Sequence, residues 1–154
     1  MEYKLLTSSE EETMVIAENI ESEKFENMVI CLIGDLGSGK TVFTKGFAAA
    51  LAIEDTITSP TFNVIKEYTS GQLPLYHMDF YRLEGDIKEL GIEEYFKKKG
   101  IVIIEWADLI EKHLPRQRLE IRFMIVDEER RLLIIKPYGK KYEELCEAVL
   151  WSHY

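Results

Sequence analysis

The hydrophobic pattern switches repeatedly between the two-residue period of strands and the 3.6-residue period of helices. The clearest strand is a run of six apolar residues at 28–33, typical of a strand covered on both faces in a parallel sheet. The clearest helix start is Ser9 with Glu12, the spacing of a capping box. The pattern predicts strands over 3–6, 28–33, 62–68, 75–80 and 101–104, a hairpin joining 119–123 to 132–135, and helices over 10–20, 41–51, 87–90, 93–98 and 139–151.

Buried strands that alternate with helices predict an α/β fold, with a mixed, mostly parallel sheet flanked by helices. The last elements predict a C-terminal β-hairpin followed by a helix. The length of 154 residues matches about one domain, so we expect a single domain over residues 1–154. An apolar share of 46% is sufficient for a packed core.

The charge balance narrows the possible partners. The chain has 28 acidic and 19 basic residues, a net charge of −9, and residues 1–30 alone carry −6. Such a chain lacks the broad positive field that attracts nucleic acid or anionic lipid, so we expect no direct grip on a nucleic acid. The longest run without Asp, Glu, Lys or Arg is 11 residues, and no signal peptide is legible, so no membrane segment is expected. Two cysteines, Cys31 and Cys146, indicate no disulfide framework and favour a cytoplasmic protein.

A glycine-rich loop follows the buried strand at 28–33 and precedes the helix at 41–51. Its sequence, GDLGSGKT at 34–41, matches the phosphate-binding pattern G-x-x-x-x-G-K-[ST]. Glycines let backbone N–H groups wrap around phosphate oxygens, the lysine reaches the β and γ phosphates, and the threonine hydroxyl binds Mg²⁺. The expected nucleotide-binding residues are Leu36, Gly37, Ser38, Gly39, Lys40 and Thr41. No Asn/Thr-Lys-x-Asp stretch that reads guanine is present, so ATP is favoured.

Acidic side chains at strand ends are candidates to complete this site. Glu105 follows the apolar run at 101–104 and is the candidate second magnesium ligand; the alternative is a surface acid at a strand end. Asp79 shares a strand face with His77 and Tyr81, so it could orient or deprotonate the attacking water or hold magnesium through a water; the alternative is a half-exposed strand face. Thr61 precedes a strand and is either a sensor of the γ-phosphate or part of a plain turn.

Four motifs in this order carry a family resemblance: GDLGSGKT at 34–41, SPTF at 59–62, HMDFYR at 77–82 and EW at 105–106. Together they resemble the TsaE (YjeE) family of small bacterial P-loop ATPases. The resemblance implies a P-loop NTPase fold and an ATPase needed for the threonylcarbamoyladenosine modification of tRNA. It also implies work with the TsaD and TsaB proteins, without transfer of the threonylcarbamoyl group by this chain.

The resemblance also implies roles for particular residues. Lys40 and Thr41 would bind ATP and magnesium, and Glu105 would be a magnesium ligand. Asp79 and Thr61 would belong to the nucleotide-sensing site, so the residues expected to act in hydrolysis are Asp79, Lys40 and Thr61. Glu10 and Arg130 align with positions that touch the nucleotide.

Three functions remain open at this point. The first is an ATPase with slow hydrolysis that resets a partner complex, because no arginine is clearly placed as a finger on the phosphates. The second is a small-molecule kinase that uses the stretch at 116–122 as a lid. The third is a binding module gated by the nucleotide, in which hydrolysis is incidental.

Overall fold

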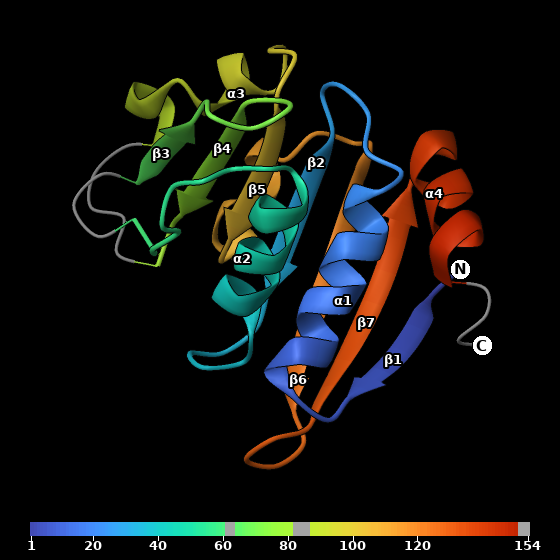
Figure 1. The fold of residues 1–154 in the computed structure, drawn as a ribbon. Coiled ribbons are helices and arrows are strands. Elements are labelled where there is room, and N and C mark those ends of the chain that lie inside the picture. Colours follow the sequence, from blue (N-terminus) through green and yellow to red (C-terminus); the bar gives the residue numbers. More distant parts are fainter. Residues whose placement is uncertain (61–63, 82–86, 151–154) are drawn as a thin grey trace.

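The chain folds around one β-sheet with helices on both faces (Figure 1). The computed structural model describes residues 1–60, 64–81 and 87–150. Within these residues the sheet has seven strands in the order β1-β7-β6-β2-β5-β4-β3. The strands are β1 (Tyr3–Thr7), β2 (Val29–Ile33), β3 (Ile65–Tyr68), β4 (Leu75–Asp79), β5 (Ile101–Glu105), β6 (Arg118–Ile125) and β7 (Arg131–Tyr138). The helices are α1 (Glu10–Glu21), α2 (Lys40–Ala50), α3 (Ile92–Tyr95) and α4 (Lys140–Leu150), with 3₁₀ helices η1 (Ile87–Leu90) and η2 (Ala107–His113).

Parallel pairing is confined to the centre of the sheet. The strands β6, β2, β5 and β4 run parallel to one another, whereas β1, β7 and β3 each pair with antiparallel neighbours. Short turns join β3 to β4 and β6 to β7, and a short turn can only connect antiparallel strands. The mixed α/β fold with a C-terminal hairpin and helix is therefore confirmed. The carboxyl ends of β2, β4 and β5 meet at one edge, where ligands bind in open α/β sheets.

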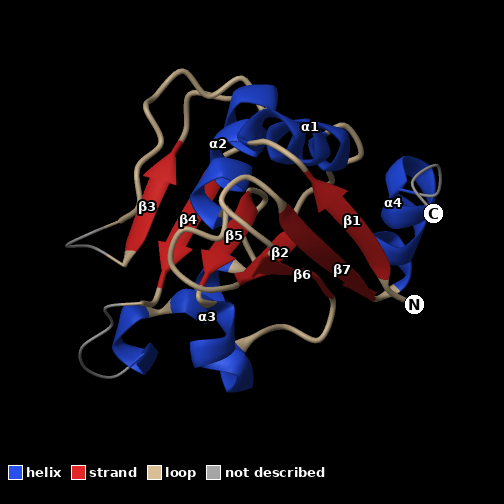
Figure 2. Cartoon of the chain, turned by 90° about the horizontal axis from the view of Figure 1, so that it is seen from below, coloured by secondary structure: helices blue, strands red, loops and turns tan. Residues whose placement is uncertain are grey.

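The central strand β2 is buried at every position, which explains its unbroken apolar run. Ile30 and Leu32 belong to the core shared with α1, α2 and α4. Val29 and Cys31 belong to the second core, shared with η1, α3 and η2. Figure 2 shows α1 and α2 on one side of the sheet and α3 on the other. The strand is thus fixed from both sides, and the loop after it starts from a rigid base.

The helix α1 begins at the predicted cap. Ser9 Oγ accepts a hydrogen bond from Glu12 N at 3.2 Å, and the Glu12 carboxylate accepts one from Ser8 N at 2.8 Å. In a capping box the second bond is donated by the backbone N–H of the cap residue itself. Here it is donated by Ser8, the residue before the cap. The bond from Glu12 N satisfies an N–H group that the first turn of the helix leaves without an intrahelical partner, and the bond from Ser8 N ties the preceding residue to that turn. They place the acidic start of α1 beside the sheet edge described above.

Some predicted boundaries differ from the structure, and one 3₁₀ helix was not predicted. The helix expected over 93–98 is only α3 (Ile92–Tyr95), and η2 was not predicted, because elements of one or two turns contain too few residues to show a period. Residues 61–63, at the start of the strand expected over 62–68, lie outside the described residues. The hairpin strand predicted at 119–123 is part of β6, which pairs with β2 and β7, so the alternative of a kinase lid over 116–122 finds no support. Across the described ranges, no helix has the length and apolar character needed to span a bilayer.

Candidate functional site: a phosphate-binding loop and its carboxylates

The glycine-rich loop connects β2 to α2 at the carboxyl edge of the sheet. Gly39, the residue before the helix, has a φ of 112°, a backbone conformation that L side chains rarely adopt. At Gly34, an added Cβ would lie 2.6 Å from Ser38 Oγ and 2.8 Å from the backbone oxygen of Phe123. The loop thus requires glycine at one position for its backbone conformation and at another for close packing against β6.

Lys40, the first residue of α2, turns its side chain into the loop. Its Nζ donates to the backbone oxygen of Gly34 at 2.5 Å and to that of Asp35 at 2.9 Å. The ammonium also lies 4.3 Å from the centre of the Trp106 ring, within the range of a cation–π contact. Burial lowers the pKa of Lys40, while the nearby carboxylate of Glu105 opposes this shift. A positive charge is therefore held at the start of a helix, where anions bind.

The carboxylate of Glu105 lies beside the hydroxyl of Thr41. Thr41 Oγ1 donates to Glu105 Oε1 at 3.1 Å and is also 3.1 Å from Ser59 Oγ. The other carboxylate oxygen, Oε2, is 2.5 Å from His77 Nε2. Both His77 and Glu105 are buried. The sequence placed Glu105 at a strand end, and the structure shows that its side chain reaches the loop helix.

Asp79 sits opposite Glu105 in the pairing of β4 with β5. Its Oδ1 accepts a hydrogen bond from Tyr81 N at 3.0 Å. Burial raises the pKa of Asp79, and the backbone hydrogen bond from Tyr81 partly offsets this effect. The Tyr81 ring stacks on Trp106, with 4.7 Å between ring centroids. These aromatic rings and the carboxylate border the space next to Lys40.

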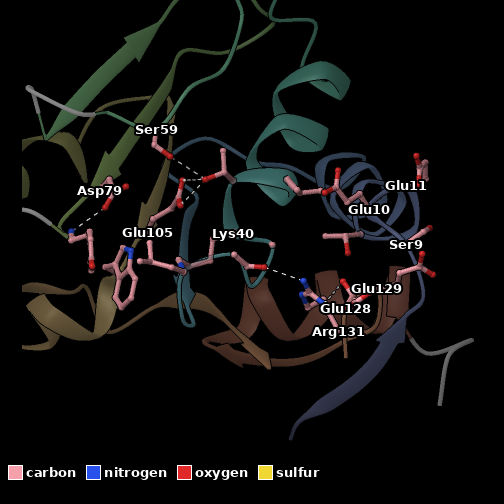
Figure 3. A pocket seen from close by; sticks show the side chains of 18 of the residues that line it. Ser9, Glu10, Glu11, Lys40, Ser59, Asp79, Glu105, Glu128, Glu129 and Arg131 are labelled. Atoms are coloured by element: carbon pink, nitrogen blue, oxygen red, sulfur yellow. Dashed lines mark hydrogen bonds between the residues drawn. The ribbon is translucent and has the colours of Figure 1, made fainter. Parts of the chain in front are cut away.

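These side chains line one cavity of about 730 Å³, large enough for a small-molecule ligand. Figure 3 shows its two ends. Lys40, Ser59, Asp79 and Glu105 gather at one end, where α2 meets β4 and β5. At the other end are Ser9, Glu10 and Glu11 from the start of α1, and Glu128, Glu129 and Arg131 from the β6–β7 turn and β7. We refer to the end at the glycine loop as the phosphate-binding end, after the sequence pattern of the loop, and to the other as the acidic end.

Most of the residues predicted from the sequence come together here. The cavity is lined by Glu10, Leu36, Gly37, Gly39, Lys40, Thr41, Asp79 and Glu105. Ser38 is buried inside the loop, where its N–H donates to the backbone oxygen of Asp35. Thr61 lies outside the described residues.

Arg130 does not line the main cavity; its Nε pairs with Asp127 Oδ2 at 2.6 Å on the exposed β6–β7 turn. The next residue, Arg131, does line it, and its Nη2 donates to the backbone oxygen of Gly37 at 3.1 Å. Trp106 and Ser59 were not predicted as site residues either. Ser59 lies in the SPTF motif, and Trp106 follows Glu105, so adjacency to the candidate residues was the signal for both.

The oxygen atoms at the phosphate-binding end fit a magnesium ion. Thr41 offers a hydroxyl and Glu105 a buried carboxylate, which are the hard oxygen ligands that Mg²⁺ prefers. Within the described ranges, no group of three or more His, Cys, Asp or Glu side chains is arranged to hold a metal. Nucleotide sites usually bind Mg²⁺ through one or two protein side chains together with phosphates and water. Thr41 and Glu105 therefore offer as many protein ligands as such a site usually has.

Three features together define a P-loop NTPase fold: the strand β2, the glycine loop that ends in Lys40 and Thr41, and the carboxylate of Glu105 on the neighbouring parallel strand β5. Comparison with known proteins narrows this class. The model of the family described as "Threonylcarbamoyl adenosine biosynthesis protein TsaE" matches residues 7–133, so the chain belongs to the TsaE family.

Individual relatives agree with this assignment. The chain is 46% identical over 146 residues to the tRNA threonylcarbamoyladenosine biosynthesis protein TsaE of Bacillus subtilis, covering 95% of this chain and 92% of that protein. It is 35% identical over 147 residues to the Nostoc protein of the same name, with 92% and 90% covered. Its fold matches the crystal structure of Bacillus subtilis YdiB with a TM-score of 0.83 and 41% identity, over 100% of this chain and 97% of that one.

Proposed function

We propose that this chain binds ATP with magnesium, hydrolyses it slowly, and thereby serves the threonylcarbamoyladenosine modification of tRNA by acting on a TsaD–TsaB complex. Membership of the TsaE family supports the role in tRNA threonylcarbamoyladenosine biosynthesis. The single observation that carries the ATPase part is the convergence of Lys40, Thr41 and Glu105 at the glycine loop.

The loop residues would bind the triphosphate. Backbone N–H groups of residues 36–41 and the start of α2 would face the phosphate oxygens, with Lys40 Nζ reaching the β and γ phosphates. Thr41 and Glu105 would hold magnesium, which supplies positive charge beside the phosphate oxygens. The opposite end of the cavity, which includes Glu10 and Arg131, would take the base and ribose.

Hydrolysis requires a water molecule in line with the γ-phosphate. Its oxygen bonds to the γ-phosphorus, while the bond from that phosphorus to the bridging oxygen breaks and leaves ADP. Two described carboxylates, Asp79 and Glu105, line the cavity at its Lys40 end. Asp79 is the one that is not paired with His77 or Thr41, so it is suited to orient this water and accept its proton. Trp106 and Tyr81 would shield the reacting groups from bulk water.

The positions of the arginines support slow hydrolysis without a partner. In the described part of the chain, Arg131 is the only arginine that lines the cavity, and it lies at the acidic end with a hydrogen bond to Gly37. An arginine finger on the transferred phosphate is worth roughly 10³ to 10⁵ in rate. A partner that supplies the missing charge, or repositions the site, would therefore accelerate the reaction.

A cytoplasmic location is part of the proposal. Cys31 and Cys146 are both free and buried, and burial raises the pKa of each thiol to about 12. Reduced, unreactive thiols suit a reducing compartment.

The pH dependence of phosphate release tests the proposed chemistry. We expect the purified protein to release phosphate from ATP with magnesium, at a rate that falls as the pH drops through the raised pKa of Asp79, because the protonated carboxyl cannot accept a proton. In Asp79→Asn, the rate should be roughly 10² to 10⁴ lower, and this acid limb should be absent. Phosphate assays from pH 4 to pH 8, with Asp55→Asn as a control at an exposed aspartate outside the cavity, measure both. An unchanged profile in Asp79→Asn would contradict this role, and no phosphate release by the wild type would contradict hydrolysis.

A further inference from the structure

A buried histidine lies directly behind the proposed magnesium ligand. His77 is in β4, has an exposed fraction of 0%, and points to the same side of the sheet as Asp79. Its Nε2 lies 2.5 Å from Glu105 Oε2. Its Nδ1 is buried and has no hydrogen-bond partner among the described residues. Among the described residues, Glu105 is therefore the one hydrogen-bond partner of the His77 side chain.

The two oxygens of Glu105 have different nearest neighbours. Oε2 lies closest to His77, whereas the Thr41 hydroxyl is nearer to Oε1, at 3.1 Å, than to Oε2, at 3.4 Å. A glutamate side chain has three rotatable bonds, and a hydrogen bond to one oxygen restricts the rotation of the whole carboxylate. As long as His77 holds Oε2, Oε1 is directed at Thr41.

The sheet explains why this arrangement is rigid. His77 is paired with Ile103 in the register of β4 with β5, so Glu105 is its diagonal neighbour two residues further along. Both strands lie in the parallel centre of the sheet, and the residues that flank His77, Tyr76 and Met78, are buried in the second core. The imidazole therefore has little freedom to leave the carboxylate.

We propose that His77 is a positioning residue: it fixes the Glu105 carboxylate so that Oε1 and the Thr41 hydroxyl together form the magnesium subsite, and thereby sets how strongly magnesium increases nucleotide affinity. This inference rests on the proposed function. It assigns to His77 no contact with the nucleotide and no proton transfer.

The test compares nucleotide affinity with magnesium and with excess EDTA, using ATP in equilibrium titrations. For His77→Met, which keeps the volume but removes the polar contact, we expect the affinity in EDTA to change less than twofold. The increase that magnesium brings should fall at least tenfold. His77→Gln should restore part of it, because its amide nitrogen can donate to Glu105 from about the position of Nε2.

A double-mutant cycle separates positioning from a general structural effect. In the Glu105→Gln background, where the carboxylate is already absent, His77→Met should bring no further loss of the magnesium effect. His113→Met is the control, because His113 is half buried on η2 and its contact with Glu93 is a longer one of 3.7 Å. Binding of Mn²⁺ to the nucleotide-loaded variants, followed by electron paramagnetic resonance, gives a readout without turnover.

Two results would overturn the proposal. One is a folded His77→Met protein with the full magnesium effect. The other is an equal loss in the wild-type and Glu105→Gln backgrounds. If His77→Met does not fold, His77→Gln and His77→Asn replace it, since the shorter Asn does not reach Glu105, and equal magnesium effects in these two variants would contradict the proposal. A wild-type protein with the same affinity in magnesium and EDTA would instead refute the proposed magnesium site itself.

Discussion

Lys40→Ala is expected to lower the affinity for ATP by about 10²-fold and to remove measurable hydrolysis. The ammonium lies in the loop within 3 Å of the backbone oxygens of Gly34 and Asp35, so it is in place to contact phosphates. A hydrogen bond to a charged group is worth about 1.5–3 kcal/mol, and each 1.4 kcal/mol is tenfold in affinity. The lysine also neutralises charge that develops during phosphoryl transfer, so the rate should fall further than the affinity.

Lys45→Ala is the matched control for this variant. Lys45 lies on the same helix, α2, but is exposed and does not line the cavity. Titrations with ATP and assays of phosphate release on both variants separate the loop contact from a general loss of positive charge. If Lys40→Ala binds ATP as tightly as Lys45→Ala, the phosphates do not bind at this loop.

Glu105→Gln is expected to lower hydrolysis by about 10²–10³-fold, the size seen when one electrostatic contact to a transition state is removed. The substitution keeps the side-chain shape but removes the negative charge next to Thr41 Oγ1. Affinity for ATP in EDTA should be retained, because the lysine and the backbone of the loop are unchanged. Phosphate release at saturating ATP and magnesium measures the effect, with Glu111→Gln on the exposed surface of η2 as the control.

The same variant distinguishes hydrolysis from nucleotide binding as the essential event. We expect tRNA threonylcarbamoyladenosine to be lost when Glu105→Gln replaces the wild-type protein in a reconstituted modification reaction. Full modification by a variant that binds ATP without hydrolysing it would show instead that the nucleotide acts as a binding switch.

Sequence patterns predicted those parts of the fold in which neighbouring residues share one environment or are joined by a local hydrogen bond. The apolar run of β2 follows from burial on both faces, and the helix α1 begins directly after Ser9 because its cap is a local hydrogen bond. The loop at 34–41 was readable because the phosphate-binding pattern fixes four of its positions, Gly34, Gly39, Lys40 and Thr41. Glu105 was predicted as a candidate ligand because it ends a strand at the carboxyl edge of a parallel sheet, and the structure places its carboxylate beside Thr41.

Long-range contacts were not readable in the same way. Arg131 reaches Gly37 only because β7 lies beside β6 and the β6–β7 turn projects toward the loop, a relation between residues 94 positions apart. The sequence drew attention to Arg130, which pairs within its own turn. Likewise, His77 was grouped with Asp79 and Tyr81 by alternation, whereas its partner Glu105 lies 28 residues further along the chain.

The most direct test of the account is phosphate release from ATP by the purified protein, with and without the TsaD and TsaB proteins. The cavity is lined by the glycine loop and its carboxylates, and within the described residues Arg131, the one arginine that lines it, is engaged by the backbone oxygen of Gly37. The account therefore predicts slow release by the isolated protein and a clear increase when TsaD and TsaB are added together. Fast release by the isolated protein, unaffected by TsaD and TsaB, would contradict it.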